Sequence, residues 1–160
     1  MPSDPFPRTV RYRRTQRAST LLLGLLGGIA LVLVVALVAA AGGDPAPLAV
    51  PAAVLVGLIS LSVLFSSLTV EVDDEALRIA FGPGLVRHAW SLDRIAAARP
   101  VRNPWWYGWG IHYTPGGWLY SVAGFEAVEI VLADGRRRRV GTDDPEGLVA
   151  ALGAARPRWI

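Results

Sequence analysis

The sequence contains no cysteine and no lysine. The first absence excludes disulfides, thiolate nucleophiles and cysteine metal ligands, and the second excludes a Schiff-base lysine and the lysine of a phosphate-binding P-loop. Charged residues are also scarce, at 18% of the 160 positions against about 25% in ordinary soluble domains. Together with 52% hydrophobic residues, this composition indicates that part of the chain lies in an apolar environment.

The positive charge is concentrated at the N-terminus. Residues 1–20 carry five Arg and one Asp, whereas residues 69–160 carry 11 Arg and 11 acidic residues. The formal net charge of +3 therefore comes from an Arg-rich arm and not from a basic domain. Since a nucleic-acid-binding domain carries its positive charge on a folded face, we expect no nucleic-acid partner.

Two long apolar runs follow the arm. Residues 21–41 contain no charge, and residues 48–68 are interrupted only by Pro51 and four serines. Each run has the length of a helix that rises about 30 Å, the thickness of the hydrocarbon core of a bilayer. Residues 42–47 between them contain Gly, Pro and Asp44, which end helices. The pattern predicts a two-helix transmembrane hairpin with the lipid bilayer as its partner.

The arginines predict the orientation of that hairpin. Five Arg before the first run place the N-terminus in the cytoplasm by the positive-inside rule, and two crossings return residues 69–160 to the same side. We therefore expect a multi-pass protein of the cell membrane with both termini cytoplasmic. A cleaved signal peptide is the alternative: Ala39–Ala41 and the pair Arg13–Arg14 favour it, but the length of the run and Gln16 oppose it.

Small residues in the first run have the spacing of a helix contact. Gly24 and Gly28 lie four residues apart, which lets two helix backbones approach closely. They are candidates for packing within the hairpin or against another copy or protein. Neither run contains an ionisable residue, which argues against a transporter.

From Thr69 onward, apolar residues alternate in short segments separated by turns, as in strands. Asp143 and Glu146 then have the spacing of a helix cap before an apolar stripe that ends near Ala155. We expect a barrel of seven or eight antiparallel strands, closed by a C-terminal helix, over residues 69–155, with a tail at 156–160. The expected strands cover 69–73, 76–81, 85–90, 95–102, 108–113, 118–122, 127–132 and 136–141.

Several of these segments also resemble a known family. The runs 107–111, 118–120, 127–130, 134–136 and 141–148 are similar to short, two-span, membrane-anchored bacterial PH-like (pleckstrin-homology-like) domains of actinobacteria. The resemblance implies a mainly-β PH-like barrel and names no ligand. The basic loop that binds phosphoinositides in eukaryotic members is absent, because the acidic residues 73–75 occupy that turn.

One segment is rich in aromatic residues. Trp105, Trp106, Tyr107 and Trp109 follow Asn103 and Pro104, with further aromatics expected on the facing strand. Three roles are open: filling the core, resting at a lipid headgroup layer, or lining a groove for a protein partner.

Residues 136–139 form the only run of charges in the domain. Because strand side chains alternate, Arg137 and Arg139 share one face and the other two arginines share the opposite face. A charged edge strand that resists pairing with other chains is one interpretation, and contact with anionic headgroups is the other.

No catalytic constellation is found. His88 and His112 lack a neighbouring carboxylate cluster, and no Gly-x-Ser-x-Gly motif is present, so we expect no enzyme, no metal and no cofactor. The sequence favours a non-catalytic, membrane-anchored PH-like binding or scaffolding module at the cytoplasmic face, able to bind a protein partner or itself. The alternative is a small accessory subunit of a larger membrane complex, recognised through its transmembrane helices.

Overall fold

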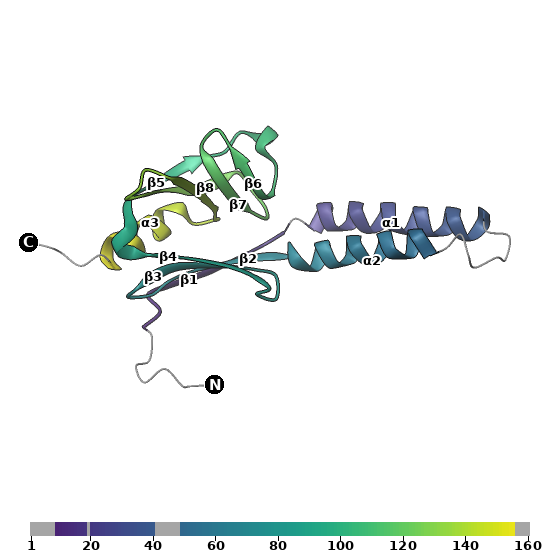
Figure 1. The fold of residues 1–160 in the computed structure, drawn as a ribbon, viewed down its shortest axis with the longest axis horizontal. Helices are drawn as coiled ribbons and strands as arrows, with labels where there is room; N and C mark the ends of the chain where they lie inside the picture. Colours follow the sequence, from purple (N-terminus) through teal and green to yellow (C-terminus); the bar gives the residue numbers. More distant parts are fainter. Residues whose placement is uncertain (1–8, 19, 41–48, 156–160) are drawn as a thin grey trace, which may run out of the picture.

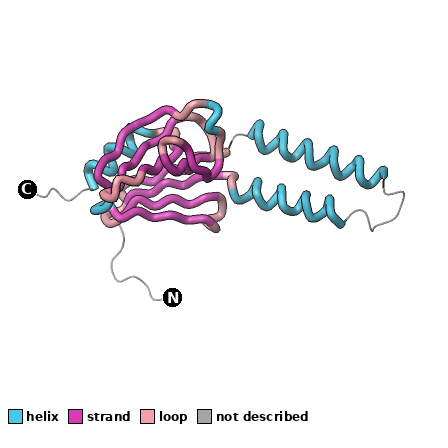
Figure 2. Tube along the Cα trace, turned by 45° about the horizontal axis from the view of Figure 1, so that its top comes forward, coloured by secondary structure: helices cyan, strands magenta, loops and turns pink. Residues whose placement is uncertain are grey.

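In the computed structural model, which describes residues 9–18, 20–40 and 49–155, the described strands form two sheets that pack on each other. Figure 2 shows these strands gathered into one body, here called the β domain, from which α1 and α2 project side by side. The predicted linker 42–47 and tail 156–160 lie outside the described residues. The two sheets correct the expectation of a single barrel.

The first sheet, sheet A, has four antiparallel strands in the order β1-β2-β3-β4. Its inner face is apolar because every second residue of β2 and β3 is buried, as alternation requires. The strands are β1 (Tyr12–Arg17), β2 (Ser67–Val72), β3 (Ala76–Phe81) and β4 (Val86–Ser91).

The second sheet, sheet B, has five strands in the order β5-β8-β9-β7-β6. The pair β7–β9 is parallel, which corrects the prediction of antiparallel strands throughout. Short 3₁₀ helices, η2 (Leu92–Arg94) and η3 (Trp105–Tyr107), precede β5 and β6. The strands are β5 (Ile95–Arg102), β6 (Gly110–Thr114), β7 (Gly117–Ser121), β8 (Glu126–Leu132) and β9 (Arg137–Gly141).

The strand β1 was not expected, because the sequence suggested a free Arg-rich arm. Tyr12–Arg17 instead pairs along its whole length with β2. Two of its arginines and the preceding Arg11 pair with acidic residues of the β domain: Arg13 lies 2.9 Å from Glu71, Arg14 lies 3.0 Å from Asp143, and Arg11 pairs with Asp74. Three of the five arginines used to predict membrane topology therefore bind β1 and the residue before it to the rest of the domain.

The helices α1 (Thr20–Ala40) and α2 (Ala49–Leu64) are inserted between the paired strands β1 and β2. We call them the helical hairpin. The second apolar run is divided, because its last residues leave the helix and Ser67 and Leu68 begin β2. The sixteen residues of α2 rise about 24 Å, less than the roughly 30 Å of a hydrocarbon core.

Within the part of the chain that the structure describes, no helix has both the length and the apolar character needed to cross a membrane. This finding overturns the predicted transmembrane hairpin. With it falls the prediction of a multi-pass cell-membrane protein with both termini in the cytoplasm.

The core lies between the two sheets and the C-terminal helix α3 (Pro145–Ala155). Leu148 and Leu152 of α3 are buried with the inner faces of both sheets. The helix is capped by Asp144, whose Oδ1 accepts from the backbone N–H of Gly147 at 3.0 Å. The predicted cap, Asp143, binds Arg14 instead.

The helical hairpin meets the β domain at a packed joint. The N–H of Ala18 donates to Ser66 O at 2.8 Å, and the rings of Phe65 and Phe81 meet edge to face at 5.6 Å. Gly82, with φ of +50°, lies so close to the end of α2 that a Cβ would approach Val63 O to 2.5 Å. The β3–β4 turn therefore abuts the end of α2.

Candidate functional site

Most described side chains of the helical hairpin are apolar and exposed, apart from those where the two helices meet. Leu31, Val32 and Leu33 of α1 are 64%, 67% and 46% exposed, and consecutive residues point about 100° apart around a helix. None of the residues described in α2 is buried. We call this the apolar hairpin surface; its large exposed side chains are Ile29, Leu31, Val32, Leu33, Val35, Val38, Val50, Val54, Val56, Ile59, Leu61 and Val63.

The described side chains of the two helices contact each other along one strip. Ala30 is buried there, and a small apolar cleft of about 280 Å³ lies between Leu33 and Leu37 of α1 and Val54 and Leu58 of α2. The predicted packing residues Gly24 and Gly28 are not part of this strip, and a Cβ on either would find no atom within 4 Å. Among the described residues, no atom lies against either glycine, and their role in helix packing stays a prediction.

The aromatic segment forms a loop at the start of β6. Trp105 and Trp106 of η3 are largely exposed, which removes core packing as their role. Tyr107 is half-buried, and its ring lies under the Arg139 guanidinium at 5.9 Å. Trp109 donates from Nε1 to Gly124 O at 2.9 Å and stacks on Phe125. Two tryptophans of this loop thus face outward from a base that is bonded to the domain.

A buried charge cluster holds that base. Glu129 of β8 is fully buried and accepts from Arg99 at 2.6 Å and from Arg139 at 3.0 Å. Arg139 also donates to Asn103 Oδ1 at 3.1 Å, so one guanidinium joins two strands to the aromatic loop. Burial raises the pKa of Glu129, but the hydrogen bonds from both arginines outweigh burial and hold that pKa below its ordinary value of 4.5.

The two candidate arginines therefore have different surroundings. The guanidinium of Arg139 is bonded within the Glu129 cluster. Arg137, in contrast, is exposed beside an open groove of about 610 Å³. Tyr113 and Trp118 line this groove together with the β8–β9 turn. In that turn a hydrogen bond from Arg136 lowers the pKa of Asp134 to about 2. The structure brings Arg139 to Tyr107 and leaves Arg137 apart from the aromatic loop.

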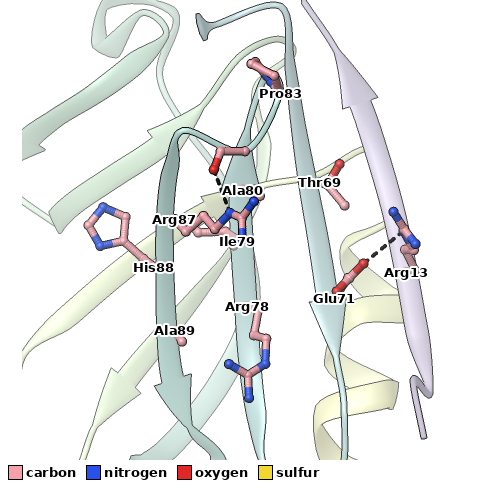
Figure 3. A pocket seen from close by; sticks show the side chains of 12 residues that line it. Arg13, Thr69, Glu71, Arg78, Ile79, Ala80, Pro83, Arg87, His88 and Ala89 are labelled. Atoms are coloured by element: carbon pink, nitrogen blue, oxygen red, sulfur yellow. Dashed lines mark hydrogen bonds and ion pairs between the residues drawn. The ribbon is translucent and has the colours of Figure 1, made fainter. Parts of the chain in front are cut away.

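A second open groove, of about 550 Å³, lies on the outer face of sheet A. Figure 3 shows Arg13 joined to Glu71 across β1 and β2, while His88 points away from both. Arg78 is held by Asp73 at 2.8 Å, and Arg87 donates to the carbonyl of Gly84 at 2.6 Å. Among the described residues Arg87 forms no ion pair, so it is the arginine of this groove that remains open to an anion.

The Glu129 cluster was missed from the sequence. A signal for it exists: Glu129 interrupts the apolar run 127–132, and a charge inside a strand with two buried faces needs a partner. The partners Arg99 and Arg139 lie opposite it on both neighbouring strands, β5 and β9. Their pairing depends on strand order, which alternation does not specify.

The described residues contain no group of three or more His, Asp or Glu placed to hold a metal ion. No protein-family model matches this sequence, and no curated protein matches it either.

Proposed function

We propose that this protein is a non-catalytic binding or scaffolding module that associates with lipid through the apolar hairpin surface and presents the β domain beside it. The observation that carries the proposal is the exposure of Leu31, Val32 and Leu33 on three sides of α1. A helix that is apolar all round is stable only where every side is covered by apolar material. A protein groove covers one side of a helix, whereas lipid surrounds it.

The composition of the two helices separates lipid association from ordinary surface binding. Neither α1 nor α2 carries a charged residue, so there is no polar face to turn toward water, as a helix lying flat on a membrane has. The proposal concerns contact with lipid acyl chains and does not require either helix to cross a bilayer. The element order of the β domain supports a PH-like assignment, which we retain as part of the proposal.

Vesicle flotation tests this function. The full chain, purified in mild detergent and mixed with phosphatidylcholine–phosphatidylglycerol vesicles during detergent removal, is expected to float with the vesicles. The double variant Val32→Asp/Val35→Asp is expected to float poorly, because each introduced carboxylate would have to enter the apolar acyl-chain region. The control Val10→Asp changes an exposed valine of the β domain and is expected to float like the parent. A parent chain that stays monomeric in water without lipid or detergent would overturn the proposal.

Gly24 and Gly28 favour a second candidate, an accessory subunit held by helix–helix contact. Their Cβ positions are open and lie away from α2, which leaves room for another helix. Under this function, native gels of the detergent-solubilised protein show an assembly that the variant Gly24→Leu/Gly28→Leu loses. Gly153→Leu in α3, where a Cβ also meets nothing, serves as the control. An unchanged mass in the double variant counts against the subunit.

A further inference from the structure

The large apolar side chains that the β domain exposes include Leu85, Trp105 and Trp106. Leu85 is 78%, Trp105 74% and Trp106 67% exposed. Leu85 lies in the β3–β4 turn and both tryptophans lie in η3, so two different sheets contribute to the set. We call these three residues the hairpin-side rim.

Contacts place the β3–β4 turn at the end of the β domain where the helical hairpin begins. Gly82 of this turn approaches the carbonyls of Val63 and Leu64, at the end of α2, and donates to Ser67 O at 2.8 Å. Pro83, which Figure 3 shows at the end of the sheet A groove, belongs to the same turn. Leu85, in the same turn, therefore lies near the joint.

Contacts place the aromatic loop at the same end. The loop is bonded to residues 124–125 through Trp109 and through the N–H of Asn103, which donates to Phe125 O at 2.7 Å. Gly124 in turn lies beside the side chain of Gln16, near the end of β1. Figure 1 agrees, because β6 lies on the side of the domain nearer the two helices and α3 lies on the far side.

The exposure of the tryptophans does not come from a loose loop. The ring of Tyr107 lies under the guanidinium of Arg139, which is itself paired with buried Glu129. The N–H of Gly108, at φ of +66°, donates to Trp105 O at 3.2 Å and closes the turn. Trp105 and Trp106 touch each other edge to face at 6.0 Å above this base. The fold thus holds two indoles outward in a fixed arrangement.

We propose that Leu85, Trp105 and Trp106 form a second lipid contact, at the level of the headgroups, next to the apolar hairpin surface. Tryptophan suits that layer because its ring is apolar and its N–H is polar. Arg87, open to an anion, and exposed Arg17 beside the joint supply the positive charge that attracts anionic phosphates. This inference rests on the proposed lipid association and specifies how the β domain is oriented on the lipid.

Photo-crosslinking in reconstituted vesicles tests the rim. The full chain carries p-benzoylphenylalanine at position 106 or, as a control, in place of Tyr113, which is 71% exposed. Tyr113 lines the groove of the β8–β9 turn, whose Asp134 lies 3.7 Å from Arg94, beyond the end of β4 remote from the joint. We expect a lipid adduct, identified by mass, at position 106 and none at position 113.

Flotation of the same samples separates the two proposals. If the chains float but give no lipid adduct at position 106, or give a protein adduct only, the proposed headgroup contact of the hairpin-side rim is wrong and the proposed lipid association stands. If the chains fail to float, the proposed lipid association is itself wrong.

Quenching of tryptophan fluorescence by brominated lipids gives a second measurement that needs no new side-chain chemistry. Trp105→Phe/Trp106→Phe is expected to lower the quenchable fluorescence about twofold. The reason is that indoles at the headgroup level lie nearer the brominated acyl chains than an indole such as Trp118, away from the lipid. Trp118→Phe, in the remote groove, is expected to leave the quenchable signal unchanged. Equal quenching in both variants would overturn the rim.

Discussion

The β domain and the helical hairpin use the same apolar residues in opposite ways. Val70, Val72 and Val128 are buried in the β domain, whereas Val32 and Val56 of the helices are more than half exposed. Strands such as β2 alternate, so one face packs on the core and the other is more open to solvent, while β8 is buried on both faces. The helices lack that division, and the described residues cover only the strip between them. Burial inside the chain thus accounts for the stability of one region and not of the other.

The sharpest way to break this comparison is to shorten one side chain in each region. Phe81→Ala removes a fully buried ring at the joint and is expected to lower the free energy of unfolding by about 3–5 kcal/mol. Leu31→Ala removes an exposed side chain and is expected to change it by less than about 0.5 kcal/mol. Urea unfolding of the detergent-solubilised chain, followed by near-UV circular dichroism, measures both. Equal losses would show that the hairpin has a core of its own.

The joint between the regions is tested by Gly82→Ala. The added Cβ would lie 2.5 Å from Val63 O at a backbone φ of +50°, so both strain and collision oppose it. We expect a loss of about 3 kcal/mol in the free energy of unfolding.

Gly135→Ala is the matched control for the joint. It has a φ of +81° and open space around its Cβ, so it carries only the backbone strain, about 1 kcal/mol. If the two variants lose the same stability, the hairpin does not press on the β3–β4 turn.

Acid distinguishes the regions further, because α1 and α2 contain no titratable side chain. The pKa of Glu129 is lower in the folded than in the unfolded chain, so its stabilisation is complete above about pH 4.5 and is lost as pH falls through the folded pKa. Glu129→Gln is expected to cost about 2 kcal/mol at pH 7 and to flatten this acid dependence. The Glu129→Gln variant keeps part of the decrease in stability with falling pH, because the pKa of Asp73 is also lowered in the folded chain. Melting temperatures from pH 7 to pH 3 give the measurement; an unchanged slope in Glu129→Gln would contradict it.

Local pattern was enough to predict most strands and the last helix. β3 and β5 have the bounds that alternation indicated, and α3 follows the predicted acidic start. β1 was missed because its arginines outweighed its weak alternation, and its pairing depends on Glu71 and Asp143, far along the chain. The second apolar run is continuous in sequence, but α2 ends at Leu64, Phe65 packs on Phe81 of the β domain, and β2 begins at Ser67.

The candidate site shows the same limit. Trp105, Trp106, Tyr107 and Trp109 are one segment with one local pattern. Trp105 and Trp106 are largely exposed, whereas Tyr107 and the partly exposed Trp109 contact partners from outside the segment. Sequence identified the segment, but the difference comes from Arg139 and Gly124, which only the fold brings near.

The smallest expected effect tests how β1, the strand that leads into the hairpin, is bound to α3. Asp144→Ala removes the helix cap and its contact with the hydroxyl of Tyr12, at 3.3 Å, and is expected to cost about 1 kcal/mol. Asp143→Ala removes only a half-exposed ion pair with Arg14, which is expected to contribute less stability than the cap because solvent screens it. Unfolding in low and high salt separates the two, because salt screens the ion pair and leaves the cap almost unchanged. If Asp143→Ala lowers the free energy of unfolding more than Asp144→Ala does, then the ion pair with Arg14, and not the helix cap, is the main contact that joins β1 to the rest of the β domain.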